Sequence, residues 1–297
     1  MIQAQPTYEP QAPAQMHCGR HRLRFGLRTL VMGVINMTPD SFSGDGLGDD
    51  VAAAVARAKV LAAAGADLLD VGGESTRPGS SPVPAGEQIR RTQPAIRAIA
   101  AEVDLPISID TTHCKVAEAA LEAGAAIIND ISALRFDKDM VHLAAQRGTP
   151  VVLMHMQGTP QTMQQAPQYE DVVAEIGRFL KERMDWAVGT GVAPQNIILD
   201  PGIGFGKTLD HNVEILRRLQ ELKALGRPLL VGPSRKAMVR ALVGQTDTTP
   251  QVVMGTAAAV ALSIQNGADI VRVHDVAEMV PVVRVTDAIV RGWRPPA

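Results

Sequence analysis

Aromatic residues are scarce in this sequence. Five Phe, two Trp and two Tyr make up 3% of the 297 residues, which argues against a protein that stacks aromatic side chains on single-stranded nucleic acid. Neither sign of charge is in excess, since 29 basic and 31 acidic side chains leave a formal net charge of -2. No overall field therefore favours binding to nucleic acid or to an anionic membrane, and any anion site must be local.

Cysteines and long apolar runs are also lacking. The two cysteines, Cys18 and Cys114, are too far apart for a metal-binding or redox motif, so we expect two reduced thiols. No apolar run approaches the length of a membrane span, and the first residues have neither the basic nor the apolar region of a secretion signal. We therefore expect a cytoplasmic protein that does not bind a membrane.

The rest of the sequence has the regular pattern of repeated βα units, in which short β-rich runs alternate with Ala- and Leu-rich segments of helical period. Residues 1–22 lack this pattern and predict a flexible N-terminal extension, which leaves residues 23–297 as one domain. The predicted strands are 30–36, 68–72, 106–110, 126–130, 150–155, 196–200, 228–232 and 269–274. Eight strands on one continuous chain favour an α/β fold with a single (β/α)8 TIM barrel over an open doubly wound sheet.

Nearly every predicted strand ends on a polar residue. In a barrel these ends lie at one face, where barrel enzymes build their active sites. Any single one of these residues could serve only as a helix cap, but a whole ring of carboxylates, amides and cations is costly to bury without a ligand. The ring predicts one shared pocket, and it comprises Asn36, Asp70, Asp110, Asn129, Asp130, His155, Asp200, Ser234, Lys236, Arg272 and His274.

Two chemically different ends can be separated within this ring. The heterocycle end supplies acceptors for N–H groups and one cation, which suits a flat, nitrogen-rich ring. It comprises Asp110, Asn129, Asp200 and Lys236. The anion end comes from the first and last strands and supplies an amide, a guanidinium and an imidazole, which suit a phosphate or pyrophosphate with Mg²⁺. It comprises Asn36, Arg272 and His274.

The segment "ILDPGIGFGKTLDHN" (198–212) ends like a phosphate-binding loop, in Gly206, Lys207 and Thr208. The first glycine of such a loop would have to stand at Pro201, and the dinucleotide pattern would need a glycine in place of Lys207. We therefore expect a flexible turn that exposes its backbone, rather than a nucleotide loop.

Eight motifs, from about residue 28 to about residue 292, resemble those of dihydropteroate synthase, the pterin-binding barrel enzyme of folate synthesis. They occur in the order and at the spacing of that family. The motifs are "GVINMTPDSFSGDG", "DVGGESTRPGS", "ISIDT", "IINDISAL", "VLMHMQGTP", "DPGIGFGK", "GPSRKAMV" and "VRVHDV".

The resemblance implies the condensation of 6-hydroxymethyl-7,8-dihydropterin diphosphate with 4-aminobenzoate to 7,8-dihydropteroate and pyrophosphate. It implies that the pterin contacts Asp110, Asn129, Asp200 and Lys236, and that Met154 is a further substrate-binding residue. It implies that the aminobenzoate is framed by Phe42, Thr76, Arg77, Pro78, Phe205 and Ser234. The diphosphate would be bound by Arg272 and His274, with Asn36 as a ligand of Mg²⁺. Catalysis would depend on Arg77, Lys236, Arg272 and His274.

The resemblance also implies a homodimer, a target of sulfonamides, and a loop or surface position for Lys207. One departure concerns the first long loop, where Gly44 stands at the position expected to hold Asp and Asp45 follows one residue later. Two rival functions remain: a methyltetrahydrofolate-binding methyltransferase, which has no use for a diphosphate site, and a non-catalytic pterin-binding paralogue. Lys236, Arg272 and His274 argue against the methyltransferase, and nothing in the motifs supports loss of activity.

Overall fold

Eight parallel strands form the predicted barrel in the computed structural model, which describes residues 15–39 and 46–294. The strands pair in the order β8-β7-β6-β5-β4-β3-β10-β9, and a bridge between Leu199 and Leu229 joins the two edges. Each begins and ends within two residues of its predicted range. The strands are β3 (Leu30–Asn36), β4 (Leu68–Gly72), β5 (Ile107–Asp110), β6 (Ile127–Asp130), β7 (Val151–Met154), β8 (Ile197–Asp200), β9 (Leu230–Val231) and β10 (Ile270–Val273).

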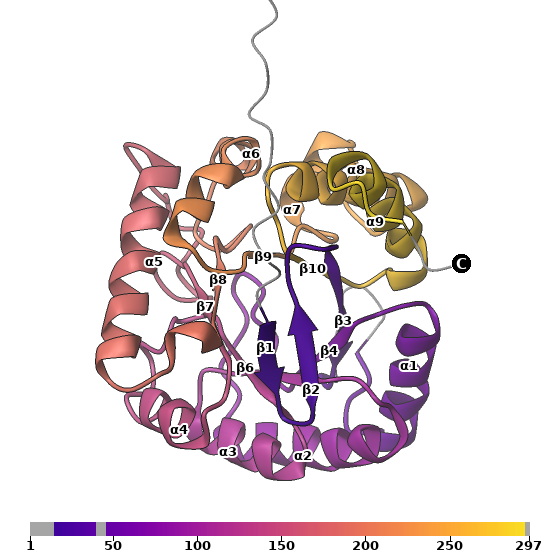
Figure 1. The fold of residues 1–297 in the computed structure, drawn as a ribbon, viewed down its shortest axis with the longest axis vertical. Helices are drawn as coiled ribbons and strands as arrows, with labels where there is room; N and C mark the ends of the chain where they lie inside the picture. The colour runs from indigo at the N-terminus through magenta and orange to yellow at the C-terminus, as the bar shows by residue number, and fades with distance from the viewer. Residues whose placement is uncertain (1–14, 40–45, 295–297) are drawn as a thin grey trace, which may run out of the picture.

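The helices surround the strands on the outside of the barrel, as Figure 1 shows. Several begin where side chains accept hydrogen bonds from free backbone N–H groups, such as Asp50 before α1 and Thr249 before α8. The α-helices are α1 (Val51–Ala63), α2 (Ala85–Glu102), α3 (Cys114–Ala123), α4 (Met140–Arg147), α5 (Val172–Gly189), α6 (Leu209–Arg217), α7 (Ala237–Leu242), α8 (Pro250–Gln265) and α9 (Val276–Val290). Two 3-10 helices are η1 (Pro194–Asn196) and η2 (Leu219–Leu225). No helix in residues 15–39 or 46–294 has the length and apolar character needed to cross a membrane.

A β-hairpin covers the end of the barrel at which the strands begin. Strands β1 (Gln15–Cys18) and β2 (His21–Arg24) pair antiparallel and lie across the barrel in Figure 1. Met16, Cys18 and Leu23 are buried against side chains at the starts of the barrel strands. The predicted flexible extension is therefore wrong for residues 15–22, and residues 1–14 lie outside the described residues. The two strands are only four residues each, so their alternating pattern was too short to recognise in the sequence.

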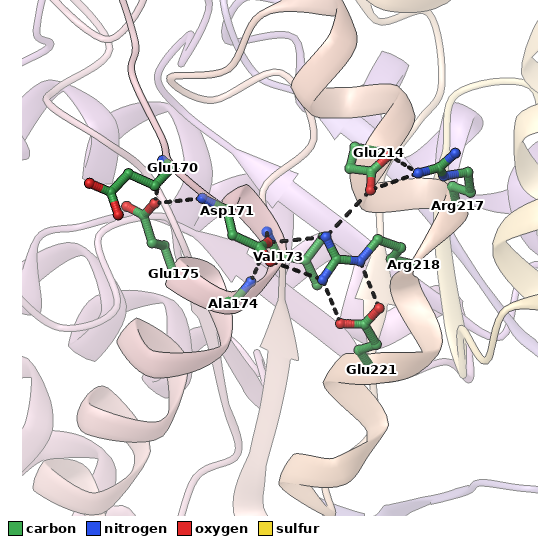
Figure 2. A network of polar contacts seen from close by, with 9 residues as sticks. All are labelled: Glu170, Asp171, Val173, Ala174, Glu175, Glu214, Arg217, Arg218 and Glu221. Atoms are coloured by element: carbon green, nitrogen blue, oxygen red, sulfur yellow. Dashed lines mark hydrogen bonds and ion pairs between the residues drawn. The ribbon is translucent and has the colours of Figure 1, made fainter.

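A cluster of charged side chains joins α5 to the helices that follow β8 (Figure 2). Asp171 caps α5 by accepting from the N–H groups of Val173 and Ala174, and its carboxylate also accepts from Arg218 at 3.1 Å. Arg218 in turn donates to Glu221 in η2 at 2.7 Å. The cluster is partly exposed, so each single pair contributes little to stability, but together the pairs link α5 to η2.

Candidate active site

The predicted pocket is present at the carboxyl ends of the strands. It is a cavity of about 790 Å³, a size that suits small-molecule ligands. Ten of the predicted site residues line it: Asn36, Thr76, Arg77, Pro78, Asp110, Phe205, Ser234, Lys236, Arg272 and His274. Asn129, Met154 and Asp200 are buried in the barrel and do not line this cavity. Phe42 lies outside the described residues, as do Gly44 and Asp45.

Arg272 joins two carboxylates at the bottom of the site. Its Nε donates to Asp70 at 2.6 Å and its Nη2 donates to Asp110 at 3.1 Å. Asn129 donates to the same oxygen of Asp70 at 3.1 Å. Arg272 was predicted to belong to the anion end, whereas one of its two partners, Asp110, belongs to the heterocycle end. Because Arg272 also lines the cavity together with His274, its guanidinium is available to both ends.

Two buried carboxylate oxygens at this position have no hydrogen-bond partner among the described residues. Asp110 Oδ1 is buried and lacks a hydrogen bond within the described part of the chain, and the same holds for Asp70 Oδ1. An acceptor left unsatisfied costs about 1 to 3 kcal/mol, more when it is charged. Because Asp110 also lines the cavity, a ligand N–H group that reaches this buried oxygen would satisfy it.

Ionisation in the site is strongly perturbed. Burial, together with the charge of Asp70, raises the pKa of Asp110 to about 7, and the charges of Arg272 and Lys236 oppose this rise. Burial raises the pKa of Asp200 to about 6, although a backbone N–H from Gly202 stabilises its carboxylate. Burial and the charge of Arg272 lower the pKa of Lys236 to about 8. Such opposed shifts, gathered in one cleft, are typical of a functional site.

The loops after β9 and β10 meet at His274 of the anion end. Ser234 Oγ lies 3.0 Å from His274 Nδ1 and accepts the backbone N–H of His274 at 3.2 Å. Arg57 of α1 donates to the His274 carbonyl at 2.8 Å. Arg235, between Ser234 and Lys236, has a positive φ of 56° and donates to Asp275 at 3.0 Å. This ion pair holds the two loops together and compensates for a backbone conformation that is uncommon outside glycine.

The glycines after β8 permit close approach of two backbones. Gly202 and Gly206 have φ of +71° and +63°, where only glycine is unstrained. A Cβ at Gly202 would lie 2.0 Å from the His155 carbonyl oxygen, and one at Gly206 would lie 2.7 Å from the Gln157 carbonyl oxygen. The loop therefore packs directly against the loop after β7 and is largely buried, so the expectation of a flexible turn that exposes its backbone is wrong.

This close packing presents Phe205 to the cavity. Lys236 Nζ lies 4.2 Å from the centroid of the Phe205 ring, in the arrangement of a cation–π contact. Phe205 also packs in an apolar cluster with Met154 and Met163. Met154 therefore packs with Phe205, which lines the cavity, but does not line the cavity itself.

Lys207 is buried, which corrects the expectation of a loop or surface lysine. Its side chain lies in the interior, with 3% of the residue exposed. Its Nζ contacts His155 Nδ1 at 3.0 Å and donates to the Phe205 carbonyl at 2.9 Å. These partners explain why the end of the segment resembles a phosphate loop without acting as one, because the ammonium points into the protein.

Some residues of the site were not singled out from the sequence. Met163 and Gln164 line the cavity, and Gln164 donates to the Gly204 carbonyl at 2.8 Å. They lie in the segment after "VLMHMQGTP", whose polar composition gave no chemical signal. Asp70 was part of the ring but had no assigned role, and its pairing with Arg272 joins residues 202 positions apart.

Comparisons with known proteins agree with this geometry. Residues 32–274 match the pterin binding enzyme family. A dihydropteroate synthase of Synechocystis sp. is 46% identical over 282 residues, covering 95% of this chain and 96% of that protein. The Yersinia pestis dihydropteroate synthase structure with a sulfonamide drug complex has a TM-score of 0.88 at 40% identity, over 94% of this chain and 99% of that one. The Xanthomonas albilineans dihydropteroate synthase structure with 4-aminobenzoic acid has a TM-score of 0.86 at 45% identity, over 93% and 98% of the two chains. The chain therefore belongs to the pterin-binding enzymes, and within them to the dihydropteroate synthase family.

Proposed function

We propose that this protein is a transferase that condenses 6-hydroxymethyl-7,8-dihydropterin diphosphate with 4-aminobenzoate, giving 7,8-dihydropteroate and pyrophosphate. The observation that carries the proposal is the Asp110 carboxylate, of which one oxygen accepts from Arg272 and the other, buried, oxygen has no partner in residues 15–39 and 46–294. A pterin ring presents N–H donors along one edge, and a carboxylate accepts such donors with charge-assisted bonds.

The pterin would lie over the interior of the barrel. Asp200 and Asp110 supply acceptors, and Lys236 supplies a cation beside the Phe205 ring. Ionised carboxylates are destabilised here by burial, so ligand N–H groups that replace water would stabilise them. The affinity for the ring would thus arise from buried carboxylates that have too few hydrogen-bond donors without it.

The chemistry needs positioning and charge stabilisation rather than a protein nucleophile. Cleavage of the C–O bond to the diphosphate leaves a cation that the electron-rich dihydropterin delocalises, and the bonding electrons leave with pyrophosphate. Arg272 and His274 stabilise the departing anion. The amine of 4-aminobenzoate, unprotonated near neutral pH, then attacks the carbon and loses a proton to solvent. Cys18 is buried in the hairpin at the opposite end of the barrel, so it takes no part.

The aminobenzoate would bind at the outer part of the cavity. Phe205, Ser234 and residues 76–78 line the cavity and would offer this substrate a ring face, a hydroxyl and the guanidinium of Arg77. The relative from Xanthomonas albilineans was solved with 4-aminobenzoic acid, which supports this substrate. The carboxylate of the substrate would face Arg77 or the Ser234 loop, and its amine would face the pterin.

Magnesium would enter with the diphosphate. Among the described residues no group of three or more His, Cys, Asp or Glu side chains is placed to hold a metal ion. Asn36 lines the cavity at the end of β3 and offers one amide oxygen. Mg²⁺ commonly takes few protein ligands and completes its shell with phosphate oxygens and water. The donor set therefore fits a diphosphate-bound Mg²⁺, which would supply further neutralisation of the leaving group.

We also propose a homodimer that acts in the cytoplasm. Exposed apolar side chains gather on α8 and α9, which pack against each other. They are Met254, Leu262, Val285 and Ile289, exposed by 71, 57, 61 and 78%. Such a patch favours burial against a second copy. Leu262→Glu should give a monomer by light scattering, whereas Val60→Glu on α1, which is exposed to a similar 58%, should leave a dimer.

Product formation tests the proposed function. With Mg²⁺, pterin diphosphate and 4-aminobenzoate, pyrophosphate and dihydropteroate should appear in equal amounts, and omission of 4-aminobenzoate should suppress pyrophosphate release. Tight pterin binding without product would favour the non-catalytic paralogue instead.

A further inference from the structure

Lys207 lines the cavity, although only 3% of the residue is exposed. Burial lowers the pKa of its amino group to about 7. Its Nζ donates to the Phe205 carbonyl at 2.9 Å and to the His155 carbonyl at 3.3 Å, and it lies 3.0 Å from His155 Nδ1. An ammonium has three N–H donors. In the charged form, all three are matched by acceptors of the protein.

His155 is held as a neutral acceptor for this ammonium. Burial and the charge of Lys207 lower the pKa of His155 to about 2. Its ring packs edge-on against Phe179, with the centroids 4.8 Å apart, and lies 6.0 Å from the ring of Tyr169. Tyr169 donates to the Gly206 carbonyl at 2.8 Å. Hydrogen bonds from Tyr169 and Lys207 therefore hold the carbonyls of Gly206 and Phe205 in the loop after β8.

Burying an ammonium in this space has a cost in free energy. Desolvation disfavours its charge, and an apolar side chain of similar volume usually packs as well or better. An apolar side chain, however, cannot donate hydrogen bonds to three acceptors that belong to two different loops. Two of these acceptors come from His155, directly after β7, and the third is the carbonyl of Phe205 in the loop after β8.

The position of Phe205 depends on both of its backbone neighbours. Gly204 is placed so that a Cβ there would lie 3.3 Å from the Lys236 side chain, and Gly206 packs against Gln157. Lys207 fixes the carbonyl between them. The Phe205 ring then lines the cavity with Lys236 Nζ 4.2 Å from its centroid.

We propose that Lys207 is a positioning residue, whose ammonium clamps the β8 loop to His155 and thereby holds the Phe205 ring against the aminobenzoate. This inference rests on the proposed function, because it assigns the space beside Phe205 to 4-aminobenzoate. It predicts that Lys207 affects the second substrate more than the first, since the pterin is held mainly by carboxylates elsewhere in the barrel.

Steady-state kinetics of Lys207→Met test this difference between the two substrates. Met has a similar length and no charge, so the fold should persist. We expect the KM for 4-aminobenzoate to rise about tenfold while the KM for pterin diphosphate stays within about twofold. Lys181→Met removes an ammonium from an exposed pair with Asp185 on α5 and should change neither value. An unchanged aminobenzoate KM, or a parallel rise of both KM values, would overturn the proposal.

Hydrogen exchange provides a readout that does not depend on turnover. In Lys207→Met the backbone amides of 202–206 and 155–158 should exchange at least about tenfold faster than in the unsubstituted protein, with the barrel strands unchanged. Equal exchange rates would show that the ammonium does not clamp the loops. If the unsubstituted protein made no dihydropteroate, the proposed function would fail, and the exchange rates would still decide whether the clamp exists.

Discussion

Replacing Asp200 with Asn should weaken pterin binding and, at the same time, stabilise the protein. Asp200 is 7% exposed and accepts one backbone N–H, from Gly202 at 2.7 Å. The substitution keeps the shape of the side chain and an acceptor for Gly202, but removes the negative charge. A ligand N–H group would then lose a charge-assisted bond, while the empty site would lose a poorly solvated carboxylate.

The loss in pterin affinity and the gain in stability have different physical origins. Loss of a hydrogen bond to a charged group costs about 1.5 to 3 kcal/mol, which corresponds to a rise in Kd of about ten- to a hundredfold. Burial raises the pKa of Asp200 from 3.8 to about 6, so the folded protein binds this proton more tightly than the unfolded chain. Its contribution to the free energy of unfolding is therefore greatest at low pH and is lost as the pH rises from about 4 to about 6. Above that range the ionised group costs at most about 3 kcal/mol, which Asn avoids.

Calorimetry and thermal unfolding measure the two effects. At about pH 8, Asp200→Asn should raise the melting temperature by up to about 6 °C, and the gain should disappear near pH 4. Titration with 6-hydroxymethylpterin should show the weaker binding. Asp104→Asn, which removes an 86% exposed carboxylate, should show neither effect. Unchanged pterin affinity in Asp200→Asn would remove this carboxylate from the binding site and refute the reasoning.

Three further predictions follow from the site. Pterin affinity should fall as the pH drops from about 8 to 6, because the pKa of Asp110 is about 7 and the protonated acid is a poorer acceptor; a flat calorimetric profile would contradict this. Arg272→Ala should reduce affinity for the pterin diphosphate about tenfold more than affinity for hydroxymethylpterin, and equal losses in binding assays would show that no separate anion end exists. Gly202→Ala should lower the free energy of unfolding by about 3 kcal/mol or more, because its Cβ would lie 2.0 Å from the His155 carbonyl; denaturant unfolding close to that of the unsubstituted protein would contradict the contact.

The barrel and most of the ring were accessible from sequence because both depend on local pattern. Each strand is a short apolar run that ends on a polar side chain, and parallel strands must place those ends at one face. The hairpin at 15–24 was missed because its burial depends on the starts of seven other strands, rather than on its own sequence.

Long-range pairing explains the remaining differences. From the sequence, Lys207 was predicted to lie in a loop or at the surface, because its acceptors on His155 lie 52 positions away. Arg272 reads as an anion ligand because its partners, Asp70 and Asp110, lie 202 and 162 positions away. Neither pairing leaves a trace in spacing or periodicity, so both became visible only with the fold.

A crystal structure with the pterin diphosphate tests most directly the claim that the site has a heterocycle end and an anion end joined by Arg272. The pterin ring should lie against Asp110, Asp200 and Lys236, with an N–H group on Asp110 Oδ1, and the diphosphate should lie toward Asn36 and His274. A ring bound at the outer part of the cavity, with Asp110 Oδ1 still without a partner, would contradict the account.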